Sequence, residues 1–141
     1  MKLGLISAIL GDLSFEEMID FLAECGLECV EVACWPKGKA ERRYAGVSHI
    51  DVDTLDDEKC AHILDYCQKK GVEISSLAYY PNTMDPDVEK RTAYIEHLHK
   101  LIDASAKLGV NMITTFIGRD PKKTVSQNLE LVKEIWPPIL D

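Results

Sequence analysis

Short apolar segments alternate with longer amphipathic segments along the whole chain. Residues 3–6 form the first apolar run, and a polar, glycine-containing stretch follows it. Further runs of mostly apolar character lie at residues 29–34, 72–78 and 110–117. Short runs of this kind, bounded by turn residues, are typical of buried strands. The pattern therefore predicts four strands.

The intervening segments carry apolar residues at helical spacing. In the first of them, Ser14 and Glu17 have the spacing of a capping box, and Gly26 stands where a helix often ends in the left-handed conformation. Similar start and stop signals predict three more helices, at about residues 56–71, 87–108 and 125–136. Strands and helices are therefore expected to alternate throughout.

Three joints between a helix and the following strand repeat one short arrangement. Each begins with a glycine, and the glycines lie 71 − 26 = 45 and 109 − 71 = 38 residues apart. Strands that alternate with helices indicate a parallel sheet with right-handed crossovers. A chain of 141 residues can build one substantial core. We therefore expect a single α/β domain over residues 1–141.

Four strand–helix units fit two architectures. They can form a small open doubly wound sheet, or the parallel (β/α)4 half of an eight-unit barrel. A complete barrel typically needs about 250 residues. This sequence stops at Asp141, after two prolines, without a fifth strand. We therefore expect half of a barrel, with the doubly wound sheet as the alternative.

Composition and charge narrow the choice of partners and location. Sixteen Lys and Arg against 24 Asp and Glu give a formal net charge of 16 − 24 = −8, which disfavours nucleic acid and anionic lipid. No apolar run approaches the roughly 18 residues of a membrane span, and the N-terminus lacks a cleavage pattern. Five cysteines without C-x-x-C spacing fit buried structural thiols in a reducing compartment. A cytoplasmic location is expected.

Candidate ligand contacts follow the strands, because both architectures bind ligands at the carboxyl ends of parallel strands. After the second strand, Trp35 could stack on a sugar ring, and a phosphate could be held by the nearby cations Lys37, Lys39, Arg42 and Arg43. A solvated surface loop with one anchoring aromatic residue is the alternative interpretation.

The next two loops offer polar groups of a similar kind. After the third strand, Tyr79, Tyr80 and Asn82 provide compact hydrogen-bonding groups, although core packing and a turn explain them equally well. After the fourth strand, Arg119 could lie over an anion, or Asp120 could simply begin the next turn.

Glu31 is a charged residue within an otherwise apolar strand. Such a carboxylate must point into a polar barrel interior, pair with a cation or mark a site. The four histidines have no spacing that favours a shared metal ion, and we expect those in helices to lie on the surface. Dinucleotide, Walker, zinc-protease and serine-hydrolase motifs are absent from the sequence. The residues alone therefore assign no catalytic group and no metal ligand.

Several stretches together resemble one known family. Residues 26–32 (GLECVEV), residues 75–82 (SSLAYYPN) and residues 106–120 (AKLGV to TFIGRD) are similar to xylose isomerase-like TIM barrels, especially the sugar phosphate isomerase/epimerase proteins. The resemblance extends over nearly the whole chain, and residues 75–120 are its most specific part.

The resemblance implies a (β/α)8 barrel with a divalent metal ion (Mn, Mg, Zn or Co) at its carboxyl mouth. In that family the later strands supply the metal ligands and two glutamates, which move a proton next to a carbonyl or hydroxyl group. This chain corresponds to the N-terminal half, so we expect it to bind no metal and to be inactive alone. Its expected role is contact with a sugar or sugar phosphate, through Trp35, Tyr79, Asn82 and Arg119.

Three further interpretations stay open at this stage. The chain could be a truncated gene product without activity. The chain could be a non-catalytic half-barrel that binds a sugar as a module. It could also assemble, either as a homodimer or with a complementary C-terminal half, and so cover the strand edges that a lone half exposes.

Overall fold

The computed structural model describes residues 1–38 and 44–140. One parallel sheet contains four strands in the order β1-β2-β3-β4: β1 (Gly4–Ile6), β2 (Cys29–Ala33), β3 (Glu73–Ala78) and β4 (Ile113–Thr114). Because each strand lies beside the next one in sequence, the sheet winds in one direction only. A doubly wound sheet reverses its direction at a switch point. The half-barrel prediction is therefore confirmed, and the doubly wound alternative is wrong.

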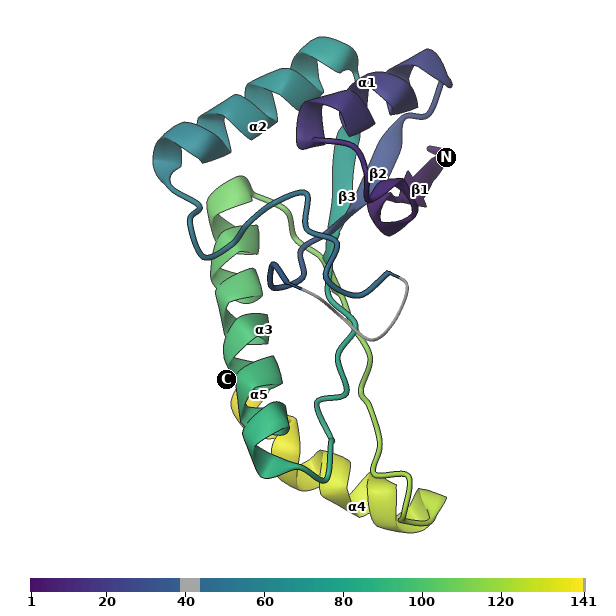
Figure 1. The fold of residues 1–141 in the computed structure, drawn as a ribbon, viewed down its shortest axis with the longest axis vertical. Helices are drawn as coiled ribbons and strands as arrows, with labels where there is room; N and C mark the ends of the chain where they lie inside the picture. Colours follow the sequence, from purple (N-terminus) through teal and green to yellow (C-terminus); the bar gives the residue numbers. More distant parts are fainter. Residues whose placement is uncertain (39–43, 141) are drawn as a thin grey trace.

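Helices connect the strands and continue beyond the last one (Figure 1). Their bounds are η1 (Ser7–Leu10), α1 (Phe15–Glu24), α2 (Asp57–Lys70), α3 (Val88–Leu108), α4 (Val125–Ile135) and α5 (Pro137–Leu140). The capping box of Ser14 and Glu17 is present at the start of α1, as predicted. Within the described residues, no helix is both long enough and apolar enough to cross a lipid bilayer.

The core lies between the sheet and the helices of one side. Val30 and Val32 of β2 are fully buried, and Met18, Ile19 and Leu22 of α1 pack in the same cluster. Burying side chains of this size stabilises the fold by roughly 1.5–3 kcal/mol each. The helix side of the sheet is therefore well packed around β2 and α1.

The buried face of α3 differs from the one that its spacing predicts. Helical spacing with Tyr94, Leu98 and Leu101 predicts Ile102 on the apolar face, but the Ile102 side chain is exposed, and His97 is buried instead. The prediction of a surface histidine is therefore wrong at this position. The physical reason is a hydrogen bond of 2.8 Å between His97 Nε2 and the Cys34 carbonyl, which satisfies the imidazole in the core.

The five cysteines are free thiols, and their environments differ. Cys34, Cys60 and Cys67 are buried, and burial raises the pKa of Cys34 to about 12 and that of Cys67 to about 11. These thiols are protonated and inert at neutral pH. Cys25 is exposed because it lies just past the end of α1, so the expectation of burial is wrong there.

A β-bulge in β3 sets the direction of its side chains. Val30 pairs with Ile74, but the next residue of β2, Glu31, pairs with Ser76, so Ser75 is an extra residue. The Ser75 hydroxyl donates to the Val30 carbonyl at 3.0 Å and holds the bulge in place. Beyond the bulge, the residues that follow alternate between the helix side and the open side of the sheet.

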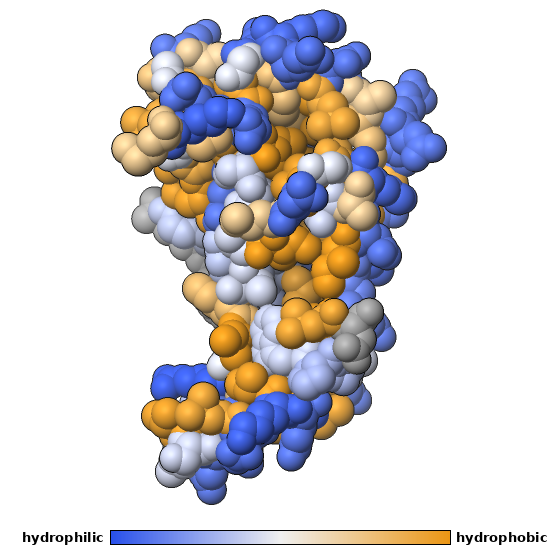
Figure 2. All heavy atoms as spheres, turned by 180° about the vertical axis from the view of Figure 1, so that it is seen from behind, coloured by the Kyte–Doolittle hydropathy of each residue, from blue (hydrophilic) through white to orange (hydrophobic). Residues whose placement is uncertain are grey.

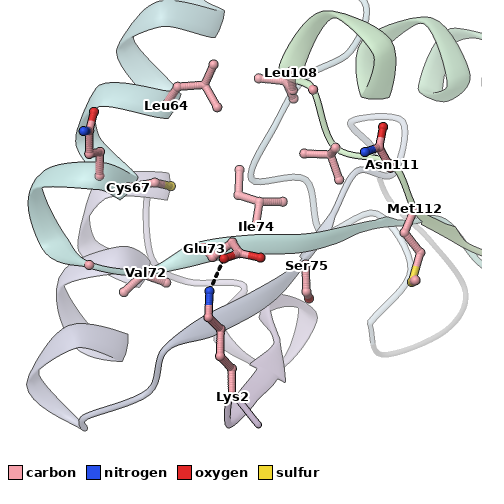
Figure 3. Close-up of a pocket in the computed structure, with 14 residues that line it drawn as sticks. Lys2, Leu64, Cys67, Val72, Glu73, Ile74, Ser75, Leu108, Asn111 and Met112 are labelled. Carbon is pink, nitrogen blue, oxygen red and sulfur yellow. Dashed lines mark hydrogen bonds and ion pairs between the residues drawn. The ribbon is translucent and has the colours of Figure 1, made fainter.

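The fourth strand is much shorter than predicted. Pairing with β3 is limited to Ile113 and Thr114, whereas the apolar pattern suggested a strand over residues 110–117. Among the described residues, β3 is the only strand that pairs with β4. In the part of the chain that the structure describes, the first residues of β3, Glu73 to Ser76, therefore have no strand beside them on the β4 side. The space next to them is part of a pocket of about 610 Å³ at the amino ends of the strands (Figure 3).

Candidate ligand-binding site

A pocket of about 570 Å³ lies at the carboxyl ends of β2 and β3. Its walls come from the loop after β2, the loop after β3 and the first turns of α3. Aromatic and cationic side chains line it, among them Trp35, Lys37, Lys90 and Tyr94. This end of a parallel sheet is where such folds bind ligands, whereas residues at the amino end serve stability. We therefore take this pocket, rather than the one in Figure 3, as the candidate site.

Three of the four sequence-predicted contacts line this pocket, namely Trp35, Tyr79 and Asn82. Arg119 is not in its wall, but its backbone is joined to Asn82. Of the basic residues predicted after the second strand, Lys37 lines the pocket, while Lys39, Arg42 and Arg43 lie outside the described residues.

Trp35 rests on a stack of buried rings. Its indole meets the ring of Tyr79 edge to face, with centroids 4.8 Å apart, and Tyr79 meets His97 in the same way at 4.7 Å. Tyr79 is only 1% exposed, and burial raises the pKa of its phenol. Tyr79 therefore contributes to the pocket mainly by supporting the Trp35 ring, and its phenol stays protonated at neutral pH.

Asn82 fastens two neighbouring loops. Its amide nitrogen donates to the Arg119 carbonyl at 2.9 Å, and its amide oxygen accepts from the Arg119 backbone N–H at 2.8 Å. A third bond between the loops runs from the Thr83 hydroxyl to the Ile117 carbonyl at 2.7 Å. Asn82 thus contributes the position of the loops, and the exposed Arg119 side chain is left to face solvent.

The turn after Arg119 follows the simpler of its two interpretations. Asp120 Oδ1 accepts from the Lys122 backbone N–H at 2.9 Å, and Asn128 Oδ1 accepts from the Asp120 N–H at 2.8 Å. Asp120 therefore begins the next turn and leads into α4.

On the opposite side of the sheet, Glu31 is the centre of a polar cluster. Its carboxylate accepts a hydrogen bond from the Ser76 hydroxyl at 3.1 Å and another from the Tyr80 hydroxyl. Burial raises the pKa of Tyr80, and the bond to Glu31 adds to this effect. The Tyr80 ring also lies 4.7 Å from that of Phe116. Of the three possibilities for Glu31, the polar interior is the one observed.

Tyr80 is one of the polar groups that the sequence offers after the third strand, but the four expected sugar contacts include only its neighbour Tyr79. In a regular strand, Ile74, Ser76 and Tyr80 would share one face, and the buried Ile74 would make that the helix face. The bulge at Ser75 reverses this assignment for the later residues. A hydroxyl-rich stretch that pairs with a strand carrying one glutamate among apolar residues is the signal that could have identified Ser76 and Tyr80.

A second cluster joins the loops after β1 and β2. The Ser7 hydroxyl accepts from the Ala33 N–H at 2.8 Å and lies 3.0 Å from His49 Nδ1, while His49 Nε2 lies 3.3 Å from the Leu10 carbonyl. With Nε2 donating to Leu10, Nδ1 accepts from Ser7. Ser7 is fully buried, so this pair holds loops together and does not present a nucleophile.

Metal binding requires several ligands that converge. Among residues 1–38 and 44–140, no three His, Cys, Asp or Glu side chains come together in a suitable group. The described residues therefore do not fit the divalent metal ion that the family resemblance implies, and we derive no step through such an ion.

The arrangement defines a class of protein: half of a parallel β/α barrel with a pocket at the carboxyl ends of its strands. A sequence model of the family described as xylose isomerase-like TIM barrel matches residues 19–141. This match includes well over half of the chain, and the chain therefore belongs to that family. No curated protein matches the sequence significantly.

Solved structures share this fold at low sequence identity. D-Psicose 3-epimerase from Clostridium cellulolyticum H10 is 18% identical with a TM-score of 0.68, over 99% of this chain and 47% of that one. AsbF of Bacillus anthracis, described as a probable 3-DHS dehydratase, is 19% identical with a TM-score of 0.66, over 95% and 45%. A xylose isomerase domain protein from Planctomyces limnophilus is 13% identical with a TM-score of 0.61, over 94% and 46%.

These comparisons fix the fold and the extent of the match. The chain spans less than half the length of each of the three structures. The resemblance to xylose isomerase-like TIM barrels is confirmed by the family match. At these identities the structures support the fold, and they leave activity and substrate to be argued from the site.

Replacing Gly118 tests how closely the two loops of the site are joined. Its φ of +82° favours glycine, and an added Cβ would lie 2.3 Å from Asn82 Oδ1. We expect Gly118→Ala to lower the free energy of unfolding by about 2–4 kcal/mol. Gly26→Ala is the matched control, because Gly26 has a φ of +70° with nothing within 4 Å, and it should cost about 1 kcal/mol. Equal losses of unfolding free energy for Gly118→Ala and Gly26→Ala in urea would contradict the close contact between the two loops.

Protonation of His49 should weaken the fold. Burial lowers the pKa of His49, although bonds to the Leu10 and Leu13 carbonyls oppose this. As the pH falls below about 6.5, the unfolded chain takes up this proton first, and the free energy of unfolding decreases. Urea unfolding between pH 5 and 8 should therefore show a smaller dependence on pH for His49→Gln. The exposed His99→Gln is the control, and an unchanged slope for His49→Gln would contradict the assignment.

Proposed function

We propose that this chain is the N-terminal half of a sugar or sugar-phosphate isomerase or epimerase, and that it supplies substrate contacts. The observation that carries the proposal is the pocket of about 570 Å³ with Trp35 in its wall. An indole face suits the C–H face of a sugar ring, since such platforms combine large apolar area with low flexibility. The names of the similar structures, which include a D-psicose 3-epimerase, support the choice of substrate class.

The residues of the pocket have different proposed roles in binding. Trp35 provides the flat surface, and the Tyr79 ring beneath it keeps the indole in place. Lys90 and Lys37 supply positive charge for a phosphate group, Lys37 while paired with Asp51 at 3.0 Å. Asn82 acts through the loop it holds, and Arg119 remains a proposed contact for an anionic group.

The chemical step needs groups that we assign to a complementary C-terminal half. Isomerisation or epimerisation moves a proton next to a carbonyl or hydroxyl group, which requires a base and an acid. A divalent metal ion (Mn, Mg, Zn or Co) would polarise the substrate oxygens when bound there. We propose that the later strands carry these groups, and that the chain alone binds sugar without turning it over.

Fluorescence of a single tryptophan tests this binding role. In Trp136→Phe, only Trp35 emits. We expect saturable changes in emission with D-fructose and D-fructose 6-phosphate, with dissociation constants in the millimolar range that is common for open sites. Adding Lys90→Gln should weaken the phosphate ester about threefold to fivefold and leave D-fructose unchanged. Lys133→Gln, on α4, is the matched control.

Two results would contradict the proposal in different ways. Emission that does not respond to either sugar up to 100 mM would contradict the assignment of this pocket as the sugar site. Equal effects of Lys90→Gln and Lys133→Gln on the affinity for the phosphate ester would contradict it as well. Exchange of sugar C–H protons with solvent deuterium, catalysed by the chain alone and followed by NMR, would place the catalytic groups in this half.

A further inference from the structure

Both edges of the sheet lack the charges that usually protect exposed strands. Residues 3–11, which include β1, contain no charged side chain, and neither do residues 108–118, which include β4. A third uncharged run, residues 74–84, covers most of the interior strand β3, so the two edges have the charge-free character of a strand that is paired on both sides. Natural proteins commonly place charges, prolines or covering segments at sheet edges to prevent pairing. These edges are instead suited to receive further strands.

Exposed apolar side chains accompany the two edges. Leu3 is 68% exposed beside β1, and near β4 Met112 is 57% and Phe116 53% exposed. Figure 2 shows apolar patches on the face seen from behind Figure 1, between polar regions. Contiguous apolar surface of this kind commonly marks an interface. A partner that continues the parallel sheet would cover both edges together.

The open face of the sheet carries a negative charge that such a partner would bury. A pocket of about 320 Å³ on this face is lined by Gly4, Leu5, Ile6, Cys29, Glu31 and Ser75, of which only Glu31 is charged. The Ser76 and Tyr80 hydroxyls satisfy its hydrogen bonds but not its charge. Within the described residues, no ion pair includes Glu31.

Closing a barrel over this face would bury an uncompensated carboxylate, which costs several kcal/mol. A second copy of the chain would make this worse. A two-fold axis along the barrel keeps all eight strands parallel and places position 31 of one copy across the interior from position 31 of the other. Two carboxylates would then face each other without a cation between them.

We infer that the occupant of this face is a complementary β/α half that presents a Lys or Arg side chain opposite Glu31. Its strands pair with β1 and β4, and its cation forms a buried, hydrogen-bonded pair with the carboxylate that Ser76 and Tyr80 hold in place. The inference rests on the proposed function, because it assumes a half-barrel that needs a second half. It adds that the second half is recognised through an ion pair between its cation and Glu31.

The chain itself provides a probe, because Glu31→Lys creates a half-barrel with the required cation. Analytical ultracentrifugation at pH 7.5 should find wild type alone and Glu31→Lys alone monomeric at micromolar concentration. An equimolar mixture should form a heterodimer at least about tenfold more tightly than either homodimer. Far-UV circular dichroism reports whether each variant folds.

Glu31→Gln keeps the experiment decisive if the lysine variant does not fold. The amide has nearly the same shape without the charge, and this variant should self-associate more strongly than wild type. A wild-type homodimer as tight as the mixture would overturn the inference and make a second copy the occupant. A mixture and a Glu31→Gln variant that both stay monomeric would also overturn it. None of these variants touches the Trp35 pocket, so the sugar titration judges the proposed function separately.

Discussion

The bulge at Ser75 decides which side chains of β3 meet the helices and which meet the open side of the sheet. One extra residue, held by a hydroxyl bond to the Val30 carbonyl, shifts the alternation of every later residue. Tyr79 therefore packs on α3 and supports Trp35, while Tyr80 turns to the other side and binds Glu31. The candidate pocket and the polar cluster both depend on this one irregularity.

The two faces of the sheet differ in packing and polarity. The helix face is a dense apolar core, in which even His97 is satisfied by a backbone carbonyl. The other face holds a carboxylate with two hydroxyl donors beside apolar side chains that are open to solvent. Hydrophobic burial stabilises the first face within the described residues, and we propose that the charge of Glu31 selects what covers the second. In this proposal the half-barrel folds around its helices, and its open face is where the partner binds.

Much of the fold could be predicted from the sequence, because local signals set it. Caps such as Ser14 with Glu17, and glycines such as Gly26, define helix ends through neighbouring backbone groups. The site was less accessible, because its geometry depends on contacts between distant segments. The bulge at Ser75 cannot be located from the alternation of apolar and polar residues, so the pattern does not show that Tyr79 and Tyr80 exchange sides of the sheet. Likewise β4 is short because its neighbours, rather than its apolar residues, determine how much of it pairs.

Hydrogen exchange across the sheet tests most directly whether the chain is an open half-barrel. Backbone amides of β2 and β3, which have a strand on each side, should be the most protected in the molecule. Those of β1 and β4 should exchange at least about tenfold faster, because each has a strand on one side only in the described chain. Equal protection of all four strands in the isolated chain would mean that the edges are already paired, and would contradict the account.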